Sequence, residues 1–250
     1  MYDILKITKV RDIVSAFKHD VEDRSGRPFS MFRWPPRLIY FHLVNNRATL
    51  YYRIRKENKR ENNFEDYTQV LPCVEMKKVD YVECPCAPAS HCEWMKSVEA
   101  LPDFVGTLPT TIMTLDGMTE YTYVPWENFS LKMKSRVSTG GRRPLYTVRV
   151  INEKRHLYTY ILKKDMVHAK SVMVAGIPID PIEMFLFPVC GKSPDRICSF
   201  MELPFSIEKR LTSQLYEMTY ISLINKNNNI QLADTKNDDR NNAIGPVQRR

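Results

Sequence analysis

The chain has 250 residues, of which 43% are hydrophobic and 26% charged, and its formal net charge is +8 at pH 7. This length corresponds to one large domain or two modest ones, and the composition is that of a globular protein. The longest uncharged run, residues 104–115, is too short to cross a membrane.

The sequence lacks the signals of secretion and of the common nucleotide-binding loops. Its N-terminus has no basic segment followed by a long apolar stretch, so we expect the protein to start in a cytoplasm. Only 8 residues are glycine, and only Gly140 and Gly141 are adjacent. The loops G-x-G-x-x-G and G-x-x-x-x-G-K-[ST] are therefore absent, which excludes the nucleotide-binding folds built on them.

Two helices are predicted at the start of the chain. The first carries one apolar stripe, with Thr8 as the expected N-cap and Gly26 as the residue that ends it. The stripe consists of Val10, Ile13, Val14, Phe17 and Val21. The second helix, from Arg37 to about Arg60, follows two prolines and carries two apolar stripes. These are Leu38, Phe41, Ala48, Tyr52 and Ile39, Leu43, Leu50, Ile54. Two stripes predict that this helix lies between packing partners.

The second half of this helix is strongly basic. Its only acid is Glu57, and its basic residues are Arg47, Arg53, Arg55, Lys56, Lys59 and Arg60. Such a face is either solvated or in contact with a neighbouring subunit, or it meets the phosphates of a nucleic acid. We take these residues as a candidate protein interface or DNA-conduit surface. Of the two possibilities, we favour a solvated or intersubunit face over contact with phosphates.

After Asn63 the hydrophobic period changes from 3.6 to 2, which predicts a β domain inserted between helices. Asp116-Gly117 separates two alternating runs and predicts a hairpin with a type I′ turn. A second hairpin is predicted around Asn152–Arg155, with further strands over residues 70–82 and 167–175. The expected fold class is α+β: a helical bundle with an inserted antiparallel β sandwich or barrel.

Beyond the β domain the chain returns to helix. Asp180, Pro181 and Glu183 have the pattern of an N-cap, an N1 proline and an N3 acid of a short helix. Residues 204–224 predict a C-terminal helix that packs on the N-terminal helices. Residues 225–250 contain seven asparagines and few core-forming residues, which predicts a flexible tail. The expected units are thus 1–66, 67–203, 204–224 and 225–250.

Six cysteines, at 73, 84, 86, 92, 190 and 198, raise the question of disulfides or a metal. Reduced thiols are expected in a cytoplasm. Cys84, Cys86, His91 and Cys92 offer soft ligands, but their spacing is unlike that of zinc sites, and we favour thiols packed in a loop stiffened by Pro85. No catalytic motif is present, so we expect no enzyme activity, no cofactor and no metal.

Aromatic residues gather on the predicted hairpins, next to basic ones. They are Tyr121, Tyr123, Trp126, Tyr146, Tyr158 and Tyr160, beside Lys132, Lys134, Arg136, Arg142 and Arg143. Nucleic-acid bases stack on such side chains, whereas core and interface packing use them equally well. We favour packing. With the basic helix, these residues support an alternative function, that of a nucleic-acid-binding module.

The order of helices, inserted β domain, returning helix and polar tail resembles the head-to-tail adaptor, or ring, proteins of short-tailed bacteriophages. Stretches similar to the ring proteins of crAss-like phages are Leu71–Glu75, Glu83–Pro88, Tyr123–Trp126 and Asp180–Pro188. These stretches lie within about residues 70–190, and the resemblance does not identify any functional residue. The resemblance implies a collar of about twelve copies under the portal, from which the β domains project.

The expected protein is therefore a virion structural protein, a ring-forming adaptor that connects the portal to the tail without catalysis. Its expected partners are other copies of itself, the portal protein and the next tail or ring protein, with non-specific contact to DNA in the channel and no membrane. Its expected location is the neck or tail of the virion, after synthesis in the host cytoplasm. A helix with two apolar stripes suits a ring in which each subunit has a neighbour on either side.

Overall fold

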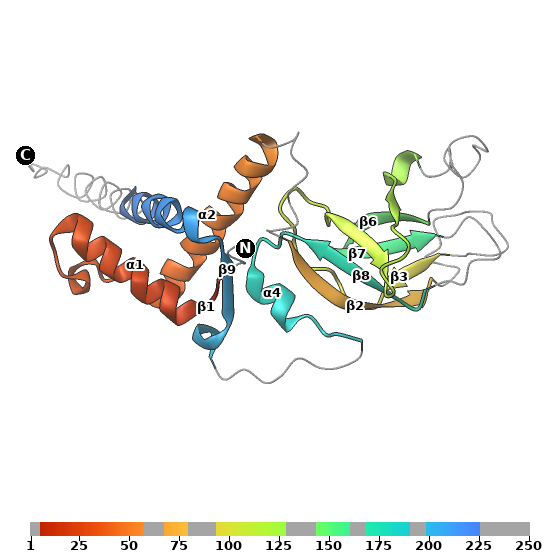
Figure 1. Cartoon of the computed structure of the whole chain (residues 1–250), viewed down its shortest axis with the longest axis horizontal. Helices are drawn as coiled ribbons and strands as arrows, with labels where there is room; N and C mark the ends of the chain where they lie inside the picture. The colour runs from red at the N-terminus through yellow and green to blue at the C-terminus, as the bar shows by residue number, and fades with distance from the viewer. Residues whose placement is uncertain are drawn as a thin grey trace, which may run out of the picture.

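The computed structural model describes residues 6–57, 68–79, 94–128, 144–160, 169–190 and 199–225. It places helices at one end of the molecule and a curved sheet at the other (Figure 1). The helices are α1 (Val10–Ser25), α2 (Pro36–Glu57) and a C-terminal helix over residues 212–225. The sheet is formed by residues between α2 and that last helix, so the predicted α+β class with an inserted β unit is confirmed.

The stripe predicted for α1 is buried along its whole length, and Gly26 ends the helix with a φ of 62°. The start of the helix differs from the prediction. Its N-cap is Lys9 rather than Thr8, because Lys6–Lys9 form strand β1. β1 pairs antiparallel with β9 (Pro204–Ile207), which is almost 200 residues away in the chain. A partner at that separation leaves no trace in the local periodicity.

The C-terminal helix begins at residue 212, so the predicted start at 204 is wrong. Phe205 and Ile207 are buried in β9, and the backbone there is hydrogen-bonded to β1 instead of to a helical turn. Short 3-10 turns occupy Phe29–Phe32, Trp126–Asn128, Phe200–Glu202 and Lys209–Leu211. Of the predicted tail, 225–250, residue 225 is the last described residue of the C-terminal helix, and 226–250 lie outside the described residues.

The three helices share one core with β9. The C-terminal helix contacts α1 through Tyr216, whose ring lies edge-on to Phe17 with centroids 5.7 Å apart. It contacts α2 through Asn46, whose Nδ2 donates to the hydroxyls of Thr219 at 3.2 Å and Ser222 at 3.4 Å. These contacts tie the returning end of the chain to both N-terminal helices.

The larger sheet has seven strands in the order β4-β8-β2-β3-β7-β6-β5. They are β2 (Gln69–Lys78), β3 (Met95–Ser97), β4 (Thr111–Thr114), β5 (Thr122–Tyr123), β6 (Leu145–Ile151), β7 (Lys154–Tyr160) and β8 (Ser171–Gly176). β5 and β6 are parallel, whereas the other neighbours are antiparallel. The sheet is therefore mixed, and the prediction of a wholly antiparallel domain is wrong on this point.

The two edges of this sheet come together next to β5. Met113 in β4 forms an antiparallel bridge with Glu120, and the Tyr121 amide donates to the Ile112 carbonyl at 2.9 Å. Tyr121 runs directly into β5 at the other edge of the sheet. The sheet is thereby a nearly closed barrel, which leaves few unpaired edge groups exposed.

Both predicted hairpins form, but the type I′ turn occurs in the second one and not at Asp116-Gly117, where it was predicted. At Asp116-Gly117 only the glycine has a positive φ, 70°, so the turn is not type I′. The Asp116 carboxylate instead accepts a hydrogen bond from the amide of Met118. The type I′ geometry occurs between β6 and β7, where Asn152 and Glu153 have φ values of 49° and 64°. This turn is shorter than predicted, since β7 begins immediately after it.

Replacing Glu153 with glycine is expected to stabilise the protein by about 1 kcal/mol. A Cβ atom in the left-handed region costs about 1–2 kcal/mol, and glycine relieves that cost at some expense of unfolded-state entropy. Thermal and urea unfolding of the Glu153→Gly variant would measure the gain. Glu153→Ala is the control, because alanine removes the charged side chain but keeps the Cβ. An alanine variant as stable as the glycine variant would contradict the explanation.

Helix α4 (Pro181–Leu186) joins the two parts of the molecule. Its predicted cap is confirmed: the Asp180 carboxylate accepts from the Ile182 amide at 2.8 Å, with proline at the first helical position. Ile182 belongs to the core of the helices, whereas Met184 and Phe187 belong to the barrel core. A single short helix therefore contributes to both cores.

Candidate interaction surface on the second helix

The two apolar stripes of α2 have different surroundings. Ile39, Leu43 and Leu50 of one stripe are buried in the core of the helices. In the other stripe, Phe41 is 58% exposed and Tyr52 is 54% exposed, although Leu38 and Ala48 are half-buried. The chain therefore covers one stripe of α2 and leaves the other open to solvent.

We define the outer face of α2 as Phe41, Asn45, Tyr52 and Lys56, all of them exposed. Their spacing of 4, 7 and 4 residues places them along one side of the helix. Arg37 and Arg53 are exposed beside them, and Glu57 is the only acid in α2. The outer face thus combines two large aromatic side chains with a local excess of positive charge.

The structure separates the six basic candidates of this helix. Arg53 and Lys56 are exposed, while Arg55 is half-buried. Lys59 and Arg60 lie outside the described residues. The prediction that Arg47 belongs to this surface is wrong, because its side chain is only 1% exposed. It cannot reach a neighbouring subunit or DNA without the fold opening.

The Arg47 guanidinium connects three segments of the chain. It donates to the carbonyl of Ser206 at 2.6 Å and to its hydroxyl at 3.2 Å. It also donates to the carbonyls of Pro178 at 2.8 Å and Ile179 at 3.4 Å. These acceptors belong to β9 and to the segment between β8 and α4. Arg47 therefore fixes α2 to two segments that follow the barrel in the chain, one directly after β8 and the other in β9.

Aromatic groups and a carboxylate surround this buried cation. The guanidinium carbon lies 4.7 Å from the centre of the Tyr51 ring, and the Tyr40 hydroxyl donates to Asp180 at 2.6 Å. Burial lowers the pKa of Arg47, while Tyr51, Tyr40 and Asp180 counteract that effect. Burial, followed by the bond to Asp180, raises the pKa of Tyr40 far above its ordinary value. Tyr40 therefore stays protonated and remains a donor.

The sequence does contain a signal for the burial of Arg47. The residue follows Leu43 by four positions and precedes Leu50 by three, which places it on the buried stripe. A charged residue on the apolar side of a helix is expected to be paired when buried, and the carbonyls of Pro178, Ile179 and Ser206 are the partners of Arg47.

Arg55 also connects the helix to the barrel. Its guanidinium donates to the carbonyl of Val105, in the segment between β3 and β4. The next residue, Gly106, has a φ of 85°, and a Cβ added there would lie 2.5 Å from Nη1 of Arg55. The positive φ favours glycine at this position, and a larger residue there would displace the Arg55 guanidinium from its place beside the Val105 carbonyl.

Three of the candidate stacking tyrosines are part of the barrel core. Tyr121, Tyr146 and Tyr158 are buried, which confirms the packing alternative for them. Burial is the main cause that raises the pKa of Tyr121 and of Tyr146 to about 12. Buried rings cannot stack on nucleic-acid bases, so the predicted stacking surface loses these members.

The remaining aromatic candidates lie near the surface of the barrel. Tyr123 is exposed, and Trp126 and Tyr160 are half-buried. Arg149 lies over the Trp126 ring, with 4.1 Å between the guanidinium carbon and the ring centre. The basic candidates at 132, 134, 136, 142 and 143 lie outside the described residues.

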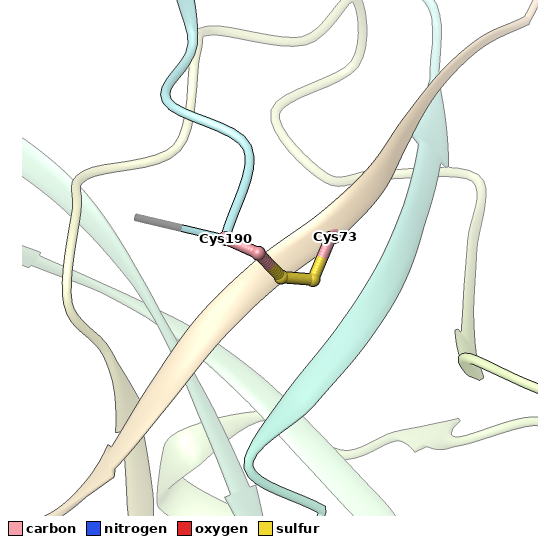
Figure 2. Close-up of a disulfide and its surroundings, with 2 residues drawn as sticks. All are labelled: Cys73 and Cys190. Atoms are coloured by element: carbon pink, nitrogen blue, oxygen red, sulfur yellow. A yellow bond between two sulfur atoms is a disulfide. The ribbon is translucent and has the colours of Figure 1, made fainter. Parts of the chain in front are cut away.

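Two of the six cysteines form a disulfide, which contradicts the expectation of reduced thiols. Figure 2 shows Cys73 of β2 joined to Cys190, which follows α4. Their Cα atoms are 5.5 Å apart, and 117 positions separate them in the sequence. Cys190 is exposed, so the bond is accessible to reductants. The pairing depends on a tertiary contact that cysteine spacing does not reveal.

The suggested metal ligands Cys84, Cys86, His91 and Cys92 lie outside the described residues. Within the described ranges, no three histidine, cysteine or acidic side chains gather as metal ligands would. In the same part of the chain, no helix has both the length and the apolar character of a membrane span. Neither a protein-family model nor the sequence of a curated protein matches this chain.

Proposed function

We propose that this protein is a structural subunit of a bacteriophage virion: a ring-forming head-to-tail adaptor that connects the portal to the tail without catalysis. The observation that carries the proposal is the outer face of α2, where Phe41 and Tyr52 are exposed between positive charges. Exposed aromatic side chains with arginine nearby are typical of protein interfaces. A second copy of the chain is the occupant that we assign to this face.

The way the two parts of the molecule are joined supports the same proposal. Arg47 and Arg55 connect α2 to the segments around the barrel, and α4 contributes to both cores. An adaptor has to assemble through one part and present another to its next partner. A firm connection between the helices and the barrel suits that division.

The disulfide is consistent with a virion location. Disulfides persist in oxidising surroundings and are rare in a reducing cytoplasm. A phage particle is assembled inside a cell and released from it, so a surface disulfide such as Cys73–Cys190 can form by the time the particle is free.

The nucleic-acid-binding alternative has fewer residues to rely on than the sequence indicated. Arg47 is buried and Arg55 is engaged with the barrel, which leaves Arg53 and Lys56 exposed among the described candidates. Two such charges support non-specific contact with DNA passing a channel, where a base-specific contact would hinder sliding.

Electron microscopy and mass measurement of the purified protein, alone and with its portal, test the proposal. We expect a ring, or a collar bound to the portal. A protein that stays monomeric and does not bind the portal would contradict the adaptor proposal. Tight binding to duplex DNA that weakens steeply with salt, in the absence of self-assembly, would favour the nucleic-acid-binding module instead.

Replacing both Phe41 and Tyr52 with serine is expected to abolish ring or collar formation while leaving the fold intact. Exposed side chains contribute little to stability, so the free energy of unfolding should change by about 0.5 kcal/mol or less per site. Sedimentation and thermal unfolding measure the two effects. Met31→Ser is the matched control, since Met31 is also an exposed apolar side chain but lies outside α2. Assembly of the double variant at wild-type strength would show that another face is used.

A further inference from the structure

An open hollow lies between α1, β9 and the C-terminal helix. Its volume is about 240 Å³, and it is lined by Asp12, Ile13, Ala16, Ile207, Lys209, Thr212 and Tyr216. Sites for small-molecule ligands are usually larger, about 300–1,000 Å³. The walls from Ile13, Ala16, Ile207 and Tyr216 are mainly apolar. The size and lining suit an inserted side chain better than a cofactor.

The α1 side of this hollow is acidic. Asp12, Asp20 and Asp23 follow the same edge of the helix as Ala16, at spacings of four, four and three residues. Arg11 and Lys18 lie toward the other side of α1, although Arg11 reaches Asp12 at 3.4 Å and Arg24 pairs with Asp20 at 2.7 Å. The C-terminal helix adds Glu217 and no basic residue over 212–225, whereas Lys209, just before that helix, lines the hollow and Arg210 follows it.

The hollow and the outer face of α2 are complementary. One is a mainly apolar depression lined by Asp12 and Lys209, with Asp20 and Asp23 along the adjoining edge of α1, and the other carries exposed aromatic side chains beside Arg37, Arg53 and Lys56. No residue of α2 lines the hollow. One molecule can therefore use both surfaces at the same time, which a head-to-tail contact requires.

We propose that the hollow receives the outer face of α2 from a neighbouring copy, so that identical subunits associate head to tail. This inference rests on the proposed function and names the second surface of its subunit contact. The opposite arrangement, α2 against α2 across a two-fold axis, would bring the arginines and Lys56 of two copies together. Like charges at an interface are unfavourable, which argues against that arrangement.

Two variants that each damage one surface test the inference. Ala16→Arg places a long charged side chain in the hollow, and arginine is well tolerated in helices. The outer-face variant is Phe41→Ser with Tyr52→Ser. Each variant alone is expected to stay monomeric where the wild type assembles. An equimolar mixture is expected to form dimers of twice the monomer mass, because one undamaged hollow and one undamaged outer face remain.

Ser15→Arg is the matched control, since Ser15 is exposed on α1 but does not line the hollow. It should assemble like the wild type. If Ala16→Arg assembles as well as the control, or the mixture stays monomeric, the head-to-tail contact is wrong while the adaptor proposal stands. If the wild type assembles neither alone nor with its portal, both proposals fail.

Discussion

Replacing Cys73 and Cys190 with serine is expected to lower the free energy of unfolding by about 4 kcal/mol. The disulfide closes a loop of 117 positions, and a cross-link over such a distance removes much of the entropy of the unfolded chain. Chain-entropy reasoning gives about 4–5 kcal/mol for a loop of this size, which is an upper value because unfolded chains retain structure. Urea unfolding without reductant, compared with the wild type, measures the loss.

The single variants identify the partners. If the two thiols are bonded only to each other, Cys73→Ser and Cys190→Ser should each cost as much as the double variant. Adding dithiothreitol to the wild type should have a similar effect, since Cys190 is exposed. Additive losses, or peptide mapping without a link between these two residues, would contradict the pairing.

Replacing Arg47 with methionine is expected to cost about 3–5 kcal/mol. Methionine keeps an unbranched apolar stem of similar shape, so the loss reports mainly on the guanidinium. Without it, the carbonyls of Pro178 and Ser206 lose a buried donor, and each unsatisfied buried group costs about 1–3 kcal/mol. Chemical unfolding of the variant measures this loss directly.

Arg53→Met is the matched control for this prediction. It makes the same substitution in the same helix, but Arg53 is exposed, so its cost should be about 0.5 kcal/mol or less. Arg47→Lys should still lose a large part of the stability, because an ammonium group lacks the planar fork that reaches several acceptors. Equal stability of the Arg47 and Arg53 variants would show that the buried contacts do not hold the parts together.

Local patterns predicted the elements whose signals lie within a few residues of one another. The buried stripe of α1, its end at Gly26 and the start of α4 at Pro181 are as expected. Each depends on side chains one to four positions apart, a distance over which helix geometry is nearly invariant. The two stripes of α2 were also predicted, together with the need for a partner on either side.

Features that depend on distant partners could not be predicted. Residues 204–207 form a strand because β1 supplies hydrogen bonds to them, although the following residues carry a helical pattern. Turn type was decided in a similar way. The register of β6 against β7 leaves only Asn152 and Glu153 between the strands and forces both into positive φ, despite the stronger preference of Asp116-Gly117 for such a turn.

The sequence by itself determined the fold class, the end of α1 at Gly26, the start of α4 at Pro181 and the presence of a second apolar stripe on α2. The tertiary structure alone decided which stripe of α2 is covered, so that Phe41 and Tyr52 are exposed, and that Cys73 meets Cys190. The physical reason is that spacing along a helix fixes which side chains share a face. Which face is covered depends on segments that fold against it from elsewhere in the chain.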